Sequence, residues 1–367
     1  MNQNPLVSII VNNYNYDQFL PDAIESALAQ TYPLTEVIVV DDGSTDGSRA
    51  VIARYGDRIT PVLKENGGQA SAFNAGFASS NGEIIIFLDA DDILLPHIVG
   101  RVVEVFQARP DIVSVHYRLS VVNADGASTG KFEPPAFCSM PNGDLRPILR
   151  TMFDHIPWPA TSGNAWAAHV LSQFFPLDEQ DIRGCADYYV QRATALFGPV
   201  ISLEDEVGGC YRVHGSNSFY RTQVDLGQLR WNITTRVFNA YEHIWRLADS
   251  LGLDVLPRNF AELSDYALLA RRLISIKLDP EGHPYGEDRL LSLCWRGIVA
   301  LLRAPDLSAP YKMLYIIWFA ALTASPSPLA WWLAQQFQAP PMAMARARLR
   351  LYVGNLHWER RFSKTRR

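Results

Sequence analysis

The sequence predicts an α/β protein in which a largely parallel sheet is covered by helices. Two observations support this class. Apolar runs of strand length alternate with helical patterns over the first 110 residues, and the runs are apolar at nearly every position instead of at every second one. Strands buried on both faces have that character, and alternation of strands with helices is typical of parallel sheets.

The expected elements follow one another closely in the first half of the chain. We expect strands over 6–11, 37–40, 59–63, 84–88, 112–122, 200–203 and 209–213. We expect helices over 20–28, 46–55, 69–78, 96–106 and 186–196, and a loop over 124–143. From about residue 222 the pattern changes to long helices. This places a domain boundary near Tyr220, between an α/β domain (1–220, with halves of about 1–110 and 111–220) and a helical region (221–367).

Composition excludes several classes. The 367 residues are 48% hydrophobic, which indicates a folded globular protein, and the net charge of −5 argues against nucleic acid as a partner. Four cysteines lie far apart without a CxxC pair, which argues against a zinc site or a disulfide framework. The N-terminal run LVSIIV is too short for a signal peptide, so we expect a cytoplasmic protein.

Polar clusters follow three of the expected strands. NNYN follows the first, DDGSTDG the second and DADD the fourth. Ligands of parallel α/β sheets bind outside the carboxyl ends of the strands. Because those ends meet at one edge, the sequence predicts a binding site there.

The DADD cluster places Asp89, Asp91 and Asp92 within four positions. Carboxylates that close repel one another and need a compensating positive charge. Mg²⁺ and Mn²⁺ are usually held by one or two carboxylates together with substrate phosphates. We therefore interpret the cluster as a metal site that a diphosphate completes. The alternative is that Asp92 caps the next helix and the other two are exposed loop acids.

The second cluster, DDGSTDGS, resembles the start of an EF-hand loop. Ala53 stands where that loop requires a bidentate glutamate, which excludes it. A strand-to-helix turn explains Gly43 and Asp46. It does not explain Asp42, which we interpret as a ligand contact.

Four further candidates are open to two interpretations each. Gly67 and Gly68, outside any GxGxxG or P-loop pattern, either let the backbone approach a ligand or end a strand. Tyr14 either stacks on a base or is a buried structural tyrosine. Asp187 begins a helix, where an acid also suits the helix dipole. His214 ends a strand and is, as a lone histidine, more often structural.

The first 92 residues carry a family resemblance. PLVSIIVNNYNYDQFLPDAIESALAQTYPLTEVIVVDDGSTDGS and ENGGQASAFNAGFASSNGEIIIFLDADD resemble the inverting family 2 glycosyltransferases of bacterial surface polysaccharides, which have a GT-A fold. The resemblance extends, more loosely, over about residues 5–215. It implies a Rossmann-like mixed sheet, a nucleotide-diphospho-sugar donor, Mg²⁺ or Mn²⁺, and displacement at the anomeric carbon by a hydroxyl of a glycan or lipid-linked acceptor.

The resemblance implies roles for the donor-binding residues. Asn12 and Tyr14 correspond to positions that cradle the base. Asp42 corresponds to a carboxylate that contacts the base or ribose, and Asp89 lies near the ribose. Gly68 joins this group because its backbone could approach the ligand.

The resemblance also implies the chemical residues. Asp91 corresponds to the metal ligand and Asp187 to the general base. His214 lies in a YRxH stretch similar to the closing motif near the diphosphate, and we include it as a metal ligand. The chain departs from the family pattern at Ala186, where a glutamate is usual, and at Tyr189, where an acid is common.

Two other functions remain open. A nucleotidyltransferase uses a related sheet but needs a Gly-rich loop after the first strand, which NNYNYDQ lacks. A non-catalytic sugar-nucleotide-binding assembly protein would explain the missing glutamate before Asp187.

The C-terminal region suggests a membrane surface. MLYIIWFAALTA (313–324) carries no charge but is too short to span a bilayer. Trp331 and Trp332 suit the headgroup boundary, and residues 341–367 hold eight basic side chains against one acid. We predict helices lying on the inner face of the cell membrane. The alternatives are that 313–338 pack as ordinary core helices against the catalytic domain, or that the region forms an oligomer contact.

Overall fold

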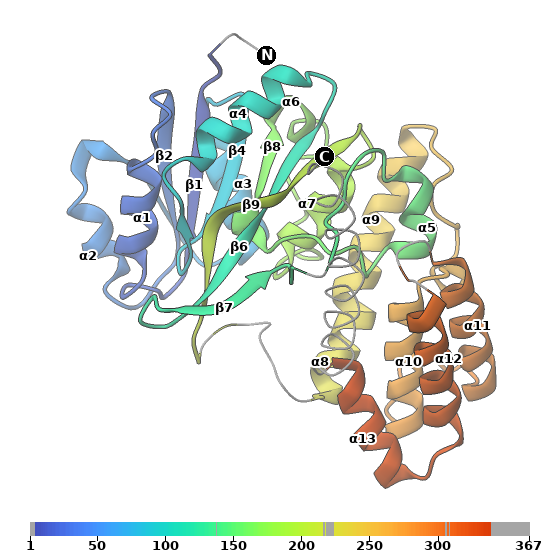
Figure 1. The fold of residues 1–367 in the computed structure, drawn as a ribbon. Helices are drawn as coiled ribbons and strands as arrows, with labels where there is room; N and C mark the ends of the chain where they lie inside the picture. The colour runs from blue at the N-terminus through green and yellow to red at the C-terminus, as the bar shows by residue number, and fades with distance from the viewer. Residues whose placement is uncertain are drawn as a thin grey trace, which may run out of the picture.

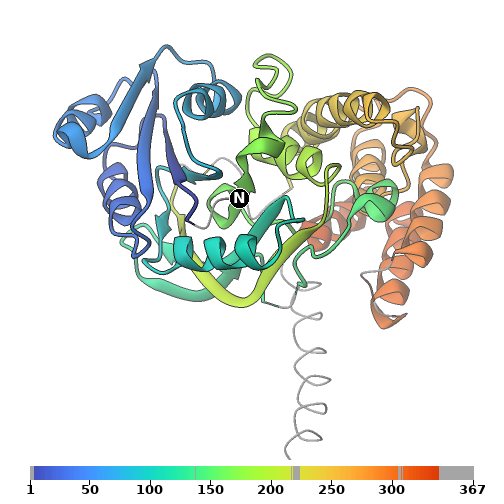
Figure 2. The same ribbon diagram turned by 90° about the horizontal axis from the view of Figure 1, so that it is seen from above.

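The computed structural model describes residues 4–136, 138–215, 217, 224–304, 307 and 309–338. An α/β part and a C-terminal group of helices lie side by side (Figure 1). Seen from above, the helical region lies at the opposite end of the molecule from β2 and β3 (Figure 2). The predicted α/β class with a helical C-terminal extension is confirmed.

Among the described residues the sheet has nine strands. They are β1 (Val7–Asn13), β2 (Thr35–Asp42), β3 (Thr60–Lys64), β4 (Ile84–Asp89), β5 (Ile93–Leu94), β6 (Ser114–Asn123), β7 (Ser128–Glu133), β8 (Asn164–Ala167) and β9 (Val200–Val213). Their order is β3-β2-β1-β4-β8-β6-β9-β5, with β7 paired to β6.

Helices connect and flank these strands. The α/β part contains α1 (Leu20–Leu28), α2 (Ser48–Ala53), α3 (Gln69–Ala78), α4 (Ile98–Ala108), α5 (Leu149–Met152), α6 (Ala168–Leu171) and α7 (Ala186–Thr194). The helical region contains α8 (Leu226–Trp231), the π-helical segment η4 (Asn232–Arg236), α9 (Val237–Ser250), α10 (Tyr266–Leu278), α11 (Leu290–Arg303), α12 (Ala309–Ala324) and α13 (Ser327–Gln338).

Strand pairing brings the predicted polar clusters together. β1 runs parallel to β2 and to β4, whereas β8 lies antiparallel between β4 and β6 and makes the sheet mixed. In this register Asn13 pairs with Asp41, and Asn12 pairs with Asp89. The carboxyl ends of three strands therefore meet at one edge, as expected.

Two expectations for the middle of the chain are wrong. The predicted loop 124–143 contains β7, whose polar and mostly exposed residues give no apolar pattern. The strands predicted over 200–203 and 209–213 are one strand, β9, which pairs with β6 on both sides of the acidic residues 204–206, where the pairing register shifts. There Arg118 Nη2 lies 2.8 Å from Glu204 Oε2, so the acidic stretch follows a basic strand neighbour instead of forming a turn.

The described residues form two hydrophobic cores. The first contains the sheet, α1 to α7 and also the inner face of α9, so that core extends past the boundary predicted near Tyr220, which lies outside the described residues. The second core contains residues of α8, α10, α11, α12 and α13. The inner face of α12 (Tyr315, Trp318, Phe319, Leu322) packs there. Residues 313–337 thus pack as core helices on one face, but within the helical region instead of against the catalytic domain.

The opposite face of α12 remains apolar and exposed. Met313 and Ile317 are 60% and 57% exposed, and Trp295 of the neighbouring α11 is 67% exposed. Across the described ranges, no helix is both long enough and apolar enough to cross a bilayer. The basic segment 341–367 lies outside the described residues.

Candidate active site

A cavity of about 1180 Å³ opens at the carboxyl edge of the sheet. It brings together seven of the eight predicted site residues, from five separate parts of the chain. They are Asn12, Tyr14, Asp42, Gly68, Asp89, Asp91 and Asp187. His214 is not part of the lining but contacts Asp91.

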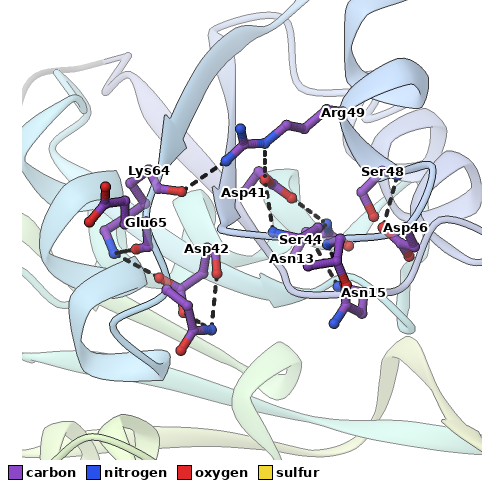
Figure 3. Close-up of polar contacts among 12 residues, drawn as sticks. Asn13, Asn15, Asp41, Asp42, Ser44, Asp46, Ser48, Arg49, Lys64 and Glu65 are labelled. Atoms are coloured by element: carbon purple, nitrogen blue, oxygen red, sulfur yellow. Dashed lines mark hydrogen bonds and ion pairs between the residues drawn. The ribbon is translucent and has the colours of Figure 1, made fainter.

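Asp42 ends β2 and organises the loop before α3. Its carboxylate is 3% exposed and accepts hydrogen bonds from Lys64 Nζ (2.7 Å), Asn66 Nδ2 (3.1 Å), and the backbone nitrogens of Gly67 (2.9 Å) and Gly68 (2.7 Å). Figure 3 shows Lys64 reaching Asp42 from β3. The protein itself uses most of the acceptor capacity of this carboxylate, so Asp42 holds the loop that borders the cavity.

The backbone conformation at position 68 requires a glycine. Gly68 immediately precedes α3, its φ is +86°, and an added Cβ would lie 2.6 Å from the carbonyl oxygen of Arg183. Only glycine adopts that conformation without strain. The interpretation of the pair as a strand end is wrong, since β3 ends at Lys64.

Asp41 is a second anchor of this edge, which sequence reasoning missed. Its fully buried carboxylate lies 2.8 Å from Arg49 Nε and accepts hydrogen bonds from Asn13 Nδ2 (3.0 Å) and the Ser44 nitrogen (3.2 Å) (Figure 3). These contacts fix the turn after β2. The only sequence signal was an acid at the end of an apolar strand.

Asn12 and Tyr14 lie at the end of β1 and line the cavity. Tyr14 is 47% exposed, which excludes the buried structural alternative and leaves its ring accessible for stacking. Asn12 Oδ1 is buried, and no protein donor reaches it in the described part of the chain. Buried polar atoms normally have a partner, so this oxygen is suited to a ligand donor.

Asp92 is a structural acid. It is 1% exposed, and its carboxylate accepts hydrogen bonds from Ser162 Oγ (2.7 Å) and the Arg212 nitrogen (2.9 Å). It therefore joins β9 to the end of β4. The alternative role as a helix cap is wrong, because α4 begins at Ile98, after His97.

Unlike Asp92, Asp91 contacts His214 through its carboxylate. Its Oδ2 lies 3.0 Å from His214 Nε2 and accepts a hydrogen bond of 3.4 Å from Asn217 Nδ2. A carboxylate and an imidazole are both usual ligands of a divalent metal. Held by these two residues, an ion would keep most of its coordination shell for water and substrate phosphates, as Mg²⁺ usually does.

The carboxylates around Asp91 repel one another. Burial and then the charge of Asp91 raise the pKa of Asp89 and of Asp92 well above the usual range. The pKa of Tyr16 is raised by burial and by the same three acids. A divalent cation would relieve this repulsion, so the residues present fit the predicted metal.

Asp187 is the second residue of α7, and its carboxylate accepts a hydrogen bond of 2.7 Å from the Tyr188 nitrogen. Gln69 fixes the start of α7, because its Oε1 accepts a hydrogen bond of 2.8 Å from the Ala186 nitrogen. The charge of Asp187 also contributes to the raised pKa of Asp89. The candidate base therefore lines the same cavity as the carboxylates of the sheet edge.

The sequence did not predict a group of aromatic, acidic and basic residues that also lines the cavity. The Tyr188 hydroxyl donates to Asp154 Oδ1 at 3.1 Å. The guanidinium carbons of Arg192 and Arg236 lie 3.4 Å and 4.2 Å from the centroid of the Tyr188 ring. All four line the cavity. Tyr188 and Arg192 lie one turn apart on α7, but Asp154 and Arg236 come from distant parts of the chain, so the sequence carried no signal that the four meet.

Another acidic group lies beside the cavity mouth. Asp178, Asp181 and His243 place one ligand atom each within 4.8 Å of one another, the one such set found in the described ranges. The two acids are exposed, and Asp178 accepts backbone hydrogen bonds from Gln180 and Asp181. These bonds form an ordinary turn, so the group gives no reason to place a metal here.

The fold and the comparisons define the class. The fold is similar to S. aureus TarS in complex with UDP, with a TM-score of 0.51 and 16% identity over 87% of this chain and 90% of that chain. This likeness supports a GT-A fold. Residues 8–153 match the family described as Glycosyl transferase family 2.

Two curated relatives agree. An uncharacterized glycosyltransferase of Nostoc sp. is 40% identical over 221 residues, 58% of this chain and 66% of the relative. The putative teichuronic acid biosynthesis glycosyltransferase TuaG of Bacillus subtilis is 42% identical over 95 residues, 25% of this chain and 38% of that protein. The chain thus spans slightly less than two thirds of the first relative. Its residues 8–153 are similar to the glycosyl transferase family 2 domain.

Proposed function

We propose that the protein is a metal-dependent inverting glycosyltransferase that moves a sugar from a nucleotide-diphospho-sugar to an acceptor hydroxyl. The observation that carries this proposal is the position of Asp187, which lines the same cavity at the carboxyl edge of the sheet as Asp89 and Asp91. A base on one side of a cavity and a diphosphate site on the other suit an in-line displacement.

The residues of the cavity have separate roles. Asn12, Tyr14, Asp42, Gly68 and Asp89 bind the nucleoside and the sugar. A divalent ion, Mg²⁺ or Mn²⁺, held by Asp91 and His214 would neutralise the charge of the diphosphate.

The reaction joins the acceptor to the donor sugar at the anomeric carbon. Asp187 accepts the proton of the acceptor hydroxyl as its oxygen forms a bond to that carbon. The bond from this carbon to the diphosphate oxygen breaks on the opposite face, so configuration inverts.

The names of the relatives support the acceptor class. TuaG is named for teichuronic acid biosynthesis. We propose a growing glycan or a lipid-linked glycan as the acceptor, consistent with the apolar outer face of α11 to α13, which would lie against the inner face of the cell membrane.

The test uses the purified protein, a panel of nucleotide sugars, and Mn²⁺. A cognate donor should raise the melting temperature in a metal-dependent manner. Asp187→Asn should retain this stabilisation and lose transfer by about 10²-fold or more. The matched control is Asp57→Asn, which changes an exposed acid far from the cavity lining.

The outcomes separate the alternatives. A non-catalytic binding protein would bind the donor but release no nucleotide from it. A nucleotidyltransferase would form sugar nucleotide from nucleoside triphosphate and sugar phosphate. Either result, or full activity of Asp187→Asn, would overturn the proposal.

A further inference from the structure

The cavity has room for more than the donor. Its volume of about 1180 Å³ exceeds the range of roughly 300–1,000 Å³ for a pocket that holds one small molecule. Part of the lining comes from outside the sheet edge, namely from Trp158 before β8 and from Trp231, Thr235 and Arg236 of the helical region. These residues are the candidates for a second ligand.

The π-helical segment explains how the helical region reaches the cavity. In an α-helix, residues five apart point about 140° away from one another. In a π-helix the hydrogen bonds connect residues five apart, so such residues lie on one face. Trp231 and Arg236 are five apart, span η4 and both line the cavity. The wider turn therefore presents an indole and a guanidinium to the same space, and π-turns are frequent at functional sites.

Two guanidiniums border this part of the cavity, together with the carboxylates of Asp154 and Asp187. The guanidinium of Arg236 lies over the Tyr188 ring, as that of Arg192 does, and donates to Asn232 Oδ1 at 3.1 Å. The pKa of Arg192 is lowered to about 10, first by burial and also by the charge of Arg236. An anion bound beside these two guanidiniums would relieve their repulsion.

We propose that Trp231, Thr235 and Arg236 form the acceptor subsite and that the acceptor is a sugar bearing a phosphate or carboxylate group. The apolar face of the sugar ring packs on the indole, the threonine hydroxyl bonds a ring hydroxyl, and the guanidinium pairs with the oxyanion. Arginine suits this task because its donors match two oxygens at once. The proposal rests on the proposed function, since Asp187 must take the proton of this same acceptor.

The experiment measures binding of three kinds of probe to the full chain, in the presence of Mn²⁺ and the nucleoside diphosphate that stabilises it most. The probes are hexose 1-phosphates, hexuronates and neutral methyl glycosides. We expect the best charged probe to bind about tenfold or more tightly than its neutral counterpart, because a charge-assisted hydrogen bond is worth about 1.5–3 kcal/mol. Preference for hexose 1-phosphates indicates a phosphate-bearing acceptor, and preference for hexuronates an acidic sugar.

Variants assign the effect to the subsite. Arg236→Gln should abolish the advantage of the charged probe, and Arg236→Lys should keep part of it, because lysine retains the charge without the planar fork. The matched control is Arg246→Gln on α9, whose side chain is 62% exposed and pairs with Glu242. It should leave binding of every probe unchanged. Melting temperatures establish that each variant is folded.

The outcomes distinguish this proposal from the proposed function. If the proposed function is wrong, no nucleotide sugar stabilises the wild-type protein, or a bound donor releases no nucleotide. If only the acceptor assignment is wrong, donor binding is normal but charged probes bind no better than neutral ones, or Arg236→Gln binds them as the wild type does. Failure of every probe to bind while the donor binds also overturns the assignment.

Discussion

The backbone nitrogen of Gly68 donates a hydrogen bond of 2.7 Å to Asp42 Oδ2. This bond joins the last residue of β2 to the residue that precedes α3. It explains why an acid and a glycine 26 positions apart border the same cavity. The carboxyl edge of the sheet is consequently a rigid frame, in which the backbone conformation matters as much as the side chains.

The first prediction concerns this frame. Gly68→Ala should cost about 2–4 kcal/mol of unfolding free energy, because positive φ and a contact with the Arg183 carbonyl act together. The matched control is Gly56→Ala, which has φ +51° but nothing within 4 Å of the added Cβ, and should cost about 1–2 kcal/mol. Thermal unfolding and donor affinity provide the comparison. Equal costs with unchanged donor binding would show that Arg183 moves aside freely.

The second prediction concerns the metal. Asp91→Asn should abolish the Mn²⁺-dependent part of donor binding, because an amide is a much weaker ligand than a carboxylate and two protein ligands are few to begin with. His214→Gln should weaken it less. The measurement is donor titration with and without chelator, and Asp125→Asn, an exposed acid in the β6–β7 hairpin, serves as the control. Metal-dependent binding that survives in Asp91→Asn would exclude this site.

The third prediction concerns pH. Burial raises the pKa of Glu133, which lines the cavity, to about 7, against the opposing charge of Arg118. Between a pH of about 4.5 and 7 the folded protein therefore holds a proton that the unfolded chain has released, so this group makes stability fall as pH rises through that window. Glu133→Gln should flatten the curve there. Unfolding free energies at several pH values test it, and parallel curves for both proteins would contradict it.

The fourth prediction concerns the loop before the candidate base. Asn239 Nδ2 donates to the Asp181 carbonyl at 3.0 Å, and His243 Nε2 lies 3.0 Å from Asp181 Oδ2. Both come from α9, so the helical region holds the loop that leads to Asp187. Combined Asn239→Ala and His243→Asn should lower kcat about tenfold with little change in donor KM, since misplacing a reacting group by 1 Å is costly. Glu242→Gln on the same helix is the control.

A loss confined to KM would show instead that α9 acts on donor binding. A single variant, His243→Gln, provides a further check, because it can still donate to Asp181. Recovery of most of kcat in that variant supports a positioning role.

The fifth prediction concerns the membrane. Replacing Trp295 and Ile317 by serine should weaken co-sedimentation with anionic vesicles, since each loses exposed apolar surface that would enter the interface. Leu251→Ser, which removes an exposed leucine at the end of α9, is the control. Deleting residues 339–367 leaves α12 and α13 intact and should remove the dependence on anionic lipid and on salt. Wild-type protein that stays in the supernatant at low salt refutes membrane association.

Much of the fold could be predicted because its signals are local. Apolar runs in β1, β2 and β4 and the periodic face of α4 identify buried elements without knowledge of their neighbours. β7 and the middle of β9 could not be identified in this way. Their residues are polar. Pairing with β6 holds β7 in the sheet, and the Arg118 side chain of β6 holds Glu204 in the middle of β9. No local pattern indicates either partner.

The candidate site shows the same division between features that local sequence signals predict and features that depend on tertiary contacts. Sequence by itself determined that Asn12, Asp42, Asp89 and Asp91 end neighbouring strands, because parallel strands share one carboxyl edge. Only the tertiary structure decided what each acid does: Asp42 holds the Gly67–Gly68 loop, Asp92 anchors β9, and Asp91 alone meets His214. It also decided that the wall around Tyr188 includes Arg236, from another region of the chain. Roles of this kind depend on which side chains compete for each polar atom, and that competition exists only once the chain has folded.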